Sequence, residues 1–463
     1  MNPDRKQLVI MGAGESGTGA ALLADAKGYQ VFVSDAGAIA SQYKKELIAH
    51  GIAFEEGQHS LEKLLAAKEV VKSPGIAWNL PIIQAIKQAN IPVIDEIELA
   101  SRYTKAFLIG ITGSNGKTTT THLVYHLLRA AGFDAGIAGN MGTSFARKVL
   151  TTNHAYYVLE LSCFQLQGMY EFQADIACLL NITPDHLDRY ANQMHAYIQA
   201  KWRLLQNMQK NHAFIYNQDD RYIQEYRQKN PIIPTQYPIS LVHKTPQGGY
   251  WHQDNFYFSL ANQAFQIPSN SMQLLGKHNQ SNTLMAIAVA ALLDIPVPTI
   301  KRALQTFQGM AHRLEWVAQI NGVACYNDSK ATTVESSYAA LSTFQQPIIW
   351  IAGGYDKGND YSLLQPLAQA QVKALIGLGK NNKPLRQAFQ GIIPLIKETQ
   401  KMQEAVSMAL NIAKPGDIIL LAPACASFDL FKNFEDRGNQ FKQAIYHAQS
   451  AHKIPNHETM DKK

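Results

Sequence analysis

The segment that most constrains the fold is residues 112–119, which read Thr-Gly-Ser-Asn-Gly-Lys-Thr-Thr. It follows an apolar run at residues 106–111, and a helical pattern begins directly after it. Glycines at such a junction let backbone N–H groups converge on a phosphate, and the helix N-terminus adds positive potential. We expect Lys117 to lie against the β- and γ-phosphates of a nucleoside triphosphate and Thr118 to reach Mg²⁺. The alternative is a chance Gly-Lys-Thr in a surface turn, which the strand-loop-helix context disfavours.

Short β-branched runs alternate with helical patterns along most of the 463 residues, which predicts a mainly parallel α/β fold. At about 150 residues per domain, the length favours three domains. We place them at residues 1–102, 103–310 and 311–463. A Tyr- and Gln-rich stretch at residues 238–260 is consistent with an antiparallel meander. The predicted strands cover residues 8–11, 30–34, 106–111, 156–160, 176–180, 323–327, 348–352, 374–377 and 418–421.

Charge argues against a nucleic-acid partner. Charged residues make up 17% of the chain, and the net charge of +6 is spread without a block of five like charges. A nucleic-acid-binding protein would concentrate its Lys and Arg on one stripe. The basic excess therefore suits a polyanionic small substrate.

The cysteines indicate a reducing compartment. Cys163, Cys178, Cys325 and Cys425 show no Cys-x-x-Cys spacing and lie among apolar or small residues. This pattern predicts buried thiols instead of disulfides or a zinc site. We see no signal peptide and no apolar stretch long enough to cross a bilayer, so we expect a cytoplasmic protein without membrane insertion.

Two polar positions follow apolar runs in the central segment. Glu160 ends the run 156–160, where a carboxylate suits Mg²⁺ at a strand terminus. His186 lies in the polar loop 181–189 after the run 176–180. From the residues alone, a carboxylate in solvent and a surface histidine remain open alternatives.

The first segment contains Gly12-Ala13-Gly14-Glu15-Ser16-Gly17, a complete Gly-x-Gly-x-x-Gly between a strand and a helix, and Asp35 closes the next strand. A dinucleotide-binding fold places its ribose-binding acid at about that position. Taken alone, the pattern favours an NAD-dependent oxidoreductase. The triphosphate loop in the next segment argues against NAD, and a glycine-rich packing turn is the other alternative.

Polar clusters follow three apolar runs in the last segment, at residues 327–332, 353–358 and 422–428. Loops at the carboxyl ends of a parallel sheet are where such folds bind ligands. Each loop alone could be ordinary surface, but the three together, two of them with a lysine, predict a pocket for an anion.

These motifs together resemble the Mur ligase family along essentially the whole chain. The family's ATP loop, Thr-Gly-x-x-Gly-Lys-Ser/Thr, accounts for Ile111 standing where a general P-loop has glycine. The further matching blocks, in order, are Gly139-Asn140, Glu160-Leu161-Ser162, Asp185-His186-Leu187-Asp188, Gly276-x-His278-Asn279-x-x-Asn282, His312-Arg313, residues 327–332, Ser427-Phe428-Asp429 and Phe434-x-x-Arg437-Gly438.

The resemblance implies a Rossmann-like UDP-binding domain, a P-loop-type ATPase domain and a C-terminal Rossmann-like amino-acid domain. It also implies an amide-bond ligase that activates a carboxylate with ATP through an acyl phosphate. The short N-terminal domain, Ser427-Phe428 and the loop Asp356-Lys357-Gly358 are most similar to the family member that adds D-glutamate to UDP-N-acetylmuramoyl-L-alanine in peptidoglycan precursor synthesis.

The resemblance also assigns residues to sites. Lys117, Glu160, His186 and Lys201 are the implied catalytic residues. Thr118, Glu160, His186 and Lys201, the last as a carbamate, would serve two Mg²⁺ sites. The implied ATP-binding residues are Gly113, Ser114, Asn115, Gly116, Lys117, Thr118, Thr119, Thr120, Asn279, Asn282, Arg313 and Asp328. Those for the UDP substrate are Ser16, Asp35, Ala36, Gly75, Asn140, Ser162, Gln165 and His186, and those for D-glutamate are Lys330, Thr332, Lys357, Ser427 and Phe434.

Other functions stay open at this point. A sibling ligase adding L-alanine is the nearest alternative, although that type lacks the lysine matched by Lys201. The Asp-Asn-Pro-Arg tetrapeptide of the diaminopimelate-adding sibling does not occur. An NAD-dependent oxidoreductase and a non-catalytic nucleotide sensor come from other classes. We expect the protein to act as a monomer.

Overall fold

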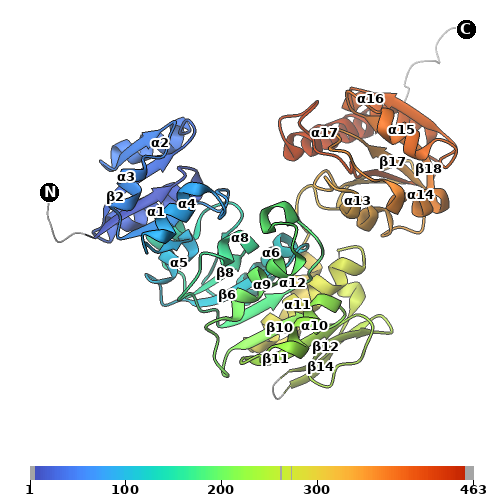
Figure 1. Cartoon of the computed structure of the whole chain (residues 1–463). Coiled ribbons are helices and arrows are strands. Elements are labelled where there is room, and N and C mark those ends of the chain that lie inside the picture. Colours follow the sequence, from blue (N-terminus) through green and yellow to red (C-terminus); the bar gives the residue numbers. More distant parts are fainter. Residues whose placement is uncertain (1–5, 261–262, 273, 454–463) are drawn as a thin grey trace, which may run out of the picture. The chain divides into compact units, whose positions relative to one another are not determined.

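The computed structural model describes residues 6–260, 263–272 and 274–453, and it has a three-domain α/β architecture with one sheet per domain (Figure 1). The chain forms two compact units, the first containing the first two sheets and the second containing the third. The boundaries between the units fall within residues 272–280 and after Phe307. The predicted α/β class with mainly parallel sheets is confirmed.

The first sheet has five parallel strands in the order β3-β2-β1-β4-β5 and is blue in Figure 1. Its chain order reverses between β1 and β4, which creates the crevice where ligands bind in open α/β sheets. The strands are β1 (Gln7–Met11), β2 (Gln30–Asp35), β3 (Ala53–Glu56), β4 (Glu69–Lys72) and β5 (Val93–Ile94). The helices are α1 (Glu15–Ala26), α2 (Ser41–Ala49), α3 (Leu61–Leu65), α4 (Pro81–Gln88) and α5 (Glu96–Ser101).

The second sheet has nine strands in the order β14-β13-β12-β11-β10-β9-β6-β8-β7. The strands are β6 (Phe107–Thr112), β7 (Ala135–Gly139), β8 (Tyr156–Glu160), β9 (Ile176–Leu179), β10 (Ala213–Asn217), β11 (Thr235–Ser240), β12 (Gly248–His252), β13 (Asn255–Leu260) and β14 (Gln263–Pro268). The helices are α6 (Lys117–Ala130), α7 (Phe145–Thr151), α8 (Cys163–Leu166), α9 (Met194–Trp202), α10 (Arg221–Lys229), α11 (Lys277–Leu292) and α12 (Val297–Thr306), with short 3₁₀ turns at Leu187–Tyr190, Arg203–Leu205 and Ser269–Ser271.

The expected meander exists, but it lies later than predicted. Strand β11 pairs parallel with β12, whereas β12, β13 and β14 pair antiparallel. The antiparallel part therefore spans residues 248–268 instead of 238–260. Alternating burial along β13 explains why its pattern was recognisable in the sequence.

The third sheet has six strands in the order β15-β16-β20-β17-β18-β19. They are β15 (Glu315–Ile320), β16 (Val323–Asn327), β17 (Ile348–Ala352), β18 (Val372–Leu378), β19 (Ile396–Thr399) and β20 (Ile418–Leu421). The helices are α13 (Val334–Leu341), α14 (Gln365–Gln371), α15 (Lys383–Phe389), α16 (Met402–Ile412) and α17 (Phe434–Lys453), with a 3₁₀ turn at Ser362–Leu364. The sequence did not predict β15 and β19, because exposed polar residues interrupt these edge strands, which lack the apolar runs of the four central ones.

The first two sheets share one hydrophobic core. A single cluster of buried side chains runs from Leu8 and Ile10 on β1, through Leu99 on α5 and Phe145 on α7, to Ile223 on α10. Helices α1 and α7 pack directly on each other within it. All four cysteines are buried free thiols, as predicted.

Buried carboxylates on α5 bind backbone N–H groups of the second sheet's segments. Glu96 accepts hydrogen bonds from Phe145 and Ala146 in the first turn of α7, at 3.3 and 2.9 Å. Glu98 accepts from backbone N–H groups of residues 170–172 at 2.9–3.2 Å. Burial raises the pKa of Glu96, and these N–H groups partly compensate by favouring its charged form. The two sheets are thus joined by polar contacts as well as by apolar packing.

The glycine-rich turn after β1 gives a sharp test of packing. A Cβ on Gly17 would lie 1.8 Å from the Gly12 carbonyl oxygen, whereas a Cβ on Gly14 would meet nothing within 4 Å. We expect Gly17→Ala to lower the free energy of unfolding by about 1–3 kcal/mol or more, because the backbone must shift. Gly14→Ala, the matched control, should leave the urea midpoint nearly unchanged. Equal midpoints for the two variants would contradict the close approach of α1 to the turn.

Candidate functional site

The phosphate loop joins β6 to α6 and requires glycine at its last position. Gly116 has φ 83°, in the left-handed region that favours glycine. A Cβ there would also lie 2.4 Å from the Oδ1 atom of Asn282 on α11. The structure therefore brings Asn282, one of the predicted ATP-binding residues, against the loop.

Two ammonium groups converge on one carbonyl oxygen of this loop. The Nζ atom of Lys117 donates to the carbonyls of Gly113 and Ser114, both at 2.8 Å. The Nζ atom of Lys201 donates to the same Gly113 oxygen at 2.9 Å. The Lys117 ammonium on these carbonyls makes the loop attractive to a polyanion such as a triphosphate, and Lys201 lies directly beside it.

Lys201 is buried, which excludes the alternative of a solvent-exposed lysine on a surface helix. Only 1% of its surface is exposed, and its Nζ atom lies 4.6 Å from the centroid of the Tyr197 ring. Burial, assisted by the charge of Lys117, lowers the pKa of Lys201 to about 7. Residues 196–201 belong to α9, as the predicted helix requires, and Lys201 reaches the phosphate loop from it.

Side chains that sequence reasoning did not single out hold the loop in place. Ser114 bonds through its hydroxyl to the Thr183 carbonyl and to the Tyr197 hydroxyl, at 2.9 and 2.8 Å. Asn181 accepts from the Asn115 N–H and donates to its carbonyl, at 2.8 and 3.0 Å. Tyr197 stands four residues before Lys201 on a helix, so this i, i+4 spacing was the one signal available for it.

Glu160 has one unsatisfied oxygen at the end of β8. The carboxylate is 3% exposed, and its Oε1 atom accepts from the Asn140 side chain at 3.0 Å. Its Oε2 atom is buried and has no hydrogen-bond partner among the described residues. Strand β8 pairs with β6, placing Glu160 opposite Ile111, immediately before the phosphate loop. An unpaired buried carboxylate oxygen beside a phosphate loop fits a hard divalent cation.

Protein side chains alone do not complete a metal site. Within the described ranges, no group of three or more His, Cys, Asp and Glu side chains is arranged to hold a metal ion. His186 is about half exposed, lies 3.4 Å from Asp185 and packs against the Phe164 ring. Mg²⁺ commonly takes one or two carboxylates plus substrate phosphates, so Glu160 suits a cation that arrives with the nucleotide.

The predicted UDP-binding residues of the first sheet gather at adjacent strand ends. Ser16 lies in the first turn of α1, Asp35 ends β2 and is followed by Ala36, and Gly75 lies just after β4. Asp35 accepts from the backbone N–H groups of Ala13 and Gly37, at 2.6 and 2.8 Å. Its carboxylate therefore shapes the glycine-rich turn.

Ser162 and Gln165, both predicted for the UDP substrate, are paired with each other. They form a capping box at the start of α8, in which each side chain bonds to the other's backbone N–H group. The Nε2 atom of Gln165 is buried and lacks a hydrogen-bond partner in the described part of the chain. It is thus a donor available to a ligand or to water.

The three polar clusters of the second unit meet, as predicted, at the carboxyl ends of β16, β20 and β17. These strands are parallel neighbours. Arg437, 1% exposed, bonds to Ser329 after β16, to Cys425 after β20 and to Gly353 after β17. Burial lowers its pKa to about 10. One guanidinium therefore fixes three loops, a role that the sequence pattern did not reveal.

The predicted D-glutamate residues lie on or beside these loops. The Nζ atom of Lys330 lies 3.9 Å from the Phe434 ring centroid, and Thr332 donates its N–H to the Lys330 carbonyl. Ser427 is buried and Lys357 is exposed. The structure brings Lys330, Thr332 and Phe434 together and leaves Lys357 on a solvent-facing loop.

Arg313 and Asp328, predicted to line the nucleotide, are also neighbours. Burial raises the pKa of Asp328 to about 7, against the opposing effects of the Leu314 N–H group and the Arg313 charge. Asn279 is buried and donates from its side chain to the Leu275 carbonyl at 2.7 Å.

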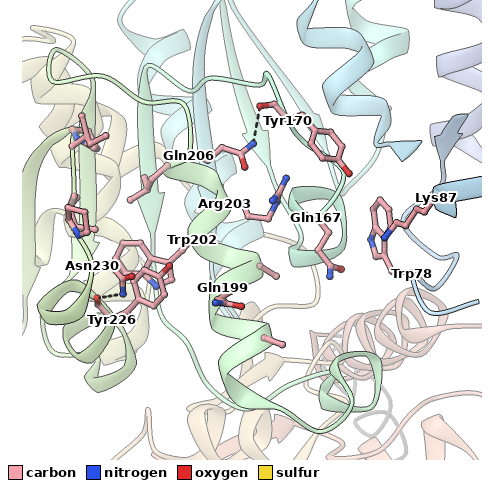
Figure 2. A pocket seen from close by; sticks show the side chains of 17 residues that line it. Trp78, Lys87, Gln167, Tyr170, Gln199, Trp202, Arg203, Gln206, Tyr226 and Asn230 are labelled. Atoms are coloured by element: carbon pink, nitrogen blue, oxygen red, sulfur yellow. Dashed lines mark hydrogen bonds between the residues drawn. The ribbon is translucent and has the colours of Figure 1, made fainter. Parts of the chain in front are cut away.

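A separate cavity of about 720 Å³ lies behind α9 in the first unit (Figure 2). Its wall includes Trp78 with Lys87 beside it, Gln199 and Arg203 from the α9 region, and Tyr226. None of the predicted site residues is among those that line it. The Arg203 side chain donates to the backbone carbonyls of Leu166 and Met169.

Comparison with protein families covers most of the chain. Residues 6–95 match the N-terminal domain of Mur ligase, MurD-like proteins, and residues 111–290 match the Mur ligase middle domain. Residues 312–425 match the Mur ligase, glutamate ligase domain.

Relatives with assigned names extend over nearly the full length. A UDP-N-acetylmuramoylalanine–D-glutamate ligase from Christiangramia forsetii is 46% identical over 95% of this chain and 99% of its own. A ligase of the same name from Porphyromonas gingivalis is 47% identical over 95% of this chain and 98% of its own. Among solved structures, the chain is similar to a UDP-N-acetylmuramate-alanine ligase from Thermotoga maritima, with a TM-score of 0.59, 16% identity and coverage of 96% and 99%. It is also similar to a MurF structure from Acinetobacter baumannii, with a TM-score of 0.59 and 15% identity; the match covers 95% of this chain and 93% of the other. The solved structures confirm the fold alone.

The depressed pKa of Lys201 predicts a dependence of stability on pH. In the unfolded chain a lysine keeps its proton up to about pH 10.4, whereas folded Lys201 loses it near pH 7. Between these values the unfolded state binds more protons, so stability rises with pH, and the cost of burying the cation is largest below pH 7. Lys201→Met should be more stable than wild type near neutral pH and should lack this part of the rise.

The measurement is urea unfolding between pH 7 and 9.5 in carbon-dioxide-free buffer, with the exposed Lys210→Met as control. If the free energy of unfolding rises with pH as steeply in Lys201→Met as in the wild type, the result would contradict the shifted pKa.

Proposed function

Since this chain belongs to the Mur ligase family, we propose that it joins D-glutamate to UDP-N-acetylmuramoyl-L-alanine with hydrolysis of ATP to ADP and phosphate. It is an ATP-dependent amide-bond-forming ligase of peptidoglycan synthesis, and therefore contributes to cell-wall biogenesis, cell shape and division. The structural observation that carries the proposal is the phosphate loop between β6 and α6, with Lys117 bound to its carbonyl oxygens and buried Lys201 beside it.

The reaction needs activation because a carboxylate oxygen is a poor leaving group. An alanyl carboxylate oxygen attacks the γ-phosphorus of ATP, the bond to the β-phosphate oxygen breaks, and an acyl phosphate and ADP result. The amine of D-glutamate then attacks the acyl carbon, a proton leaves the nitrogen, and phosphate departs from the tetrahedral intermediate. Such chemistry depends mainly on positioning and on neutralising negative charge.

The ATP loop supplies both requirements. In this proposal the backbone N–H groups of Gly113 and Gly116, ahead of the α6 N-terminus, face the phosphates. Ser114 and Asn115 complete the loop, and their N–H groups donate to the carbonyl and side-chain oxygens of Asn181. The Lys117 ammonium is released from carbonyl oxygens to phosphate oxygens when a triphosphate binds. Further contacts to the nucleotide in this proposal come from Thr119, Thr120, Asn279, Asn282, Arg313 and Asp328.

Mg²⁺ fits this site. Thr118 and Glu160 would hold one ion beside the triphosphate, and His186 with carbamylated Lys201 would hold a second beside the substrate carboxylate. When bound, the ions neutralise charge that develops during phosphoryl transfer. The buried Oε2 atom of Glu160 supports the first position.

The remaining residues bind the two other substrates in this proposal. Ser16, Asp35, Ala36 and Gly75 would contact the UDP moiety, and Asn140, Ser162, Gln165 and His186 the muramoyl end. Ala36 offers only its backbone to uracil. Lys330, Thr332, Lys357, Ser427 and Phe434 would hold the two carboxylates of D-glutamate and leave its amine free.

The proposal includes a cytoplasmic, monomeric enzyme with domains at residues 1–102, 103–310 and 311–463. No described helix has the length and apolar character to cross a membrane.

Phosphate release with individual amino acids tests the function. With UDP-N-acetylmuramoyl-L-alanine and ATP, D-glutamate should give the highest kcat/KM, and L-glutamate and D-alanine should be rejected by up to ~10⁴-fold, since they misplace the amine or leave buried polar groups unpaired. Lys117→Ala should remain folded and fail to turn over. A higher kcat/KM with L-alanine and UDP-N-acetylmuramic acid would assign the chain to a sibling activity.

Carbamylation of Lys201 has its own readout. An amine with a pKa of about 7 is substantially uncharged at neutral pH, which is the form that reacts with carbon dioxide. In ¹³C-bicarbonate, wild-type protein with Mg²⁺ should show a carbamate carbon resonance that Lys201→Arg lacks, and Lys201→Ala should lose activity. An identical spectrum for both proteins, or full activity of Lys201→Ala, would end this assignment.

A further inference from the structure

The turn after β4 encloses a buried lysine that the proposed chemistry does not use. Lys72 is the last residue of β4 and is 1% exposed. Its Nζ atom donates to the carbonyl oxygens of Ser73 and Ile76, both at 2.9 Å. The Ile76 N–H group also donates to the Ser73 carbonyl, closing the turn at 3.1 Å. The ammonium group therefore binds both ends of the turn that carries Gly75.

The surroundings of this ammonium are specific. Its Nζ atom lies 4.7 Å from the Trp78 ring centroid, a favourable cation–π distance. Burial lowers the pKa of Lys72, and the charge of Asp95 opposes that shift. Asp95 is itself buried, and its Oδ2 atom has no hydrogen-bond partner within the described residues. The opposite charges of Lys72 and Asp95 thus stabilise each other through space.

The turn faces the glycine-rich turn of β1. A Cβ on Gly12 would lie 2.6 Å from the Ser73 hydroxyl oxygen and 3.5 Å from the Ile76 side chain. The Ser73 hydroxyl donates to the Gly12 carbonyl at 3.3 Å. Strands β1 and β4 are the neighbours at which the strand order of the sheet reverses. A change in the 73–76 turn would therefore alter the crevice itself.

We propose that Lys72 is a positioning residue for the UDP-linked substrate, holding the 73–76 turn so that Gly75 presents its backbone at the crevice between β1 and β4. This role rests on the proposed function for the identity of the substrate. Lys72 does not touch the substrate, since its side chain is enclosed by the turn and by Trp78. Its effect is on substrate binding and not on phosphoryl transfer, because the ATP loop lies on another sheet.

The test compares Lys72→Met and Lys72→Arg with a matched control, Lys87→Met. Lys87 is exposed, and its Nζ atom lies 4.7 Å from the same Trp78 ring centroid. We expect Lys72→Met to raise the KM for UDP-N-acetylmuramoyl-L-alanine by about tenfold, the effect of losing buried hydrogen bonds. The KM for ATP and kcat should stay within about twofold. Lys72→Arg should recover much of the loss, and Lys87→Met should resemble wild type.

Several outcomes would overturn the proposal. One is a folded Lys72→Met with an unchanged KM for the UDP-linked substrate, which would indicate a purely structural lysine. Others are equal losses toward ATP and the UDP-linked substrate, or an equal effect of Lys87→Met. If Lys72→Met does not fold, Lys72→Gln carries the same comparison with Lys72→Arg.

Failure of the proposed function is distinguishable. It would appear as wild-type protein that does not use UDP-N-acetylmuramoyl-L-alanine. Calorimetric titration of UDP itself into the same variants would then decide the role of Lys72, with weaker binding to Lys72→Met expected and equal binding overturning it.

Discussion

Parallel strands place all their carboxyl ends at one edge of a sheet, and the location of every candidate site in this protein depends on that constraint. The loop after β6, the carboxylate at the end of β8 and the helix that follows β9 meet for this reason, although 88 residues separate Gly113 from Lys201. The same constraint gathers the loops after β16, β17 and β20 in the second unit. The topology of the sheets therefore brings the candidate residues together, and individual contacts then hold them in place.

Buried ionisable side chains are a second feature that the candidate sites share. Lys201, Glu160 and Arg437 are almost fully enclosed and bond mainly to backbone or amide groups instead of to opposite charges. Such arrangements cost stability, because a charge is removed from water without a full counter-charge. Proteins often retain such groups at functional sites, and Lys201 and Glu160 both lie beside the phosphate loop.

The sequence predicted the strands that are apolar throughout, since burial on both faces leaves a continuous signal at β9, β17 and β20. In the third sheet it missed β15 and β19, where exposed polar residues interrupt the apolar ones. It also predicted polar loops after these apolar runs, and the structure places those loops at the carboxyl ends of the strands, where open α/β sheets bind ligands. It could not predict that Tyr197 and Asn181 brace the phosphate loop, that Arg437 ties three loops together, or that Lys72 lies inside a turn. Those roles depend on tertiary neighbours, and only Tyr197 has a local signal, its i, i+4 spacing to Lys201.

The single core shared by the first two sheets has a consequence for biosynthesis. Side chains from Leu8 to Ile223 belong to one buried cluster, and α5 is bonded to α7 across the two sheets. A nascent chain that has emerged from the ribosome only as far as α5 still lacks α7, which packs on both α1 and α5. The apolar side chains that α1 and α5 turn toward α7 stay exposed to water until that helix has been synthesised. The N-terminal sheet is therefore expected to complete its folding together with the ATP-binding part, as one cooperative event during translation.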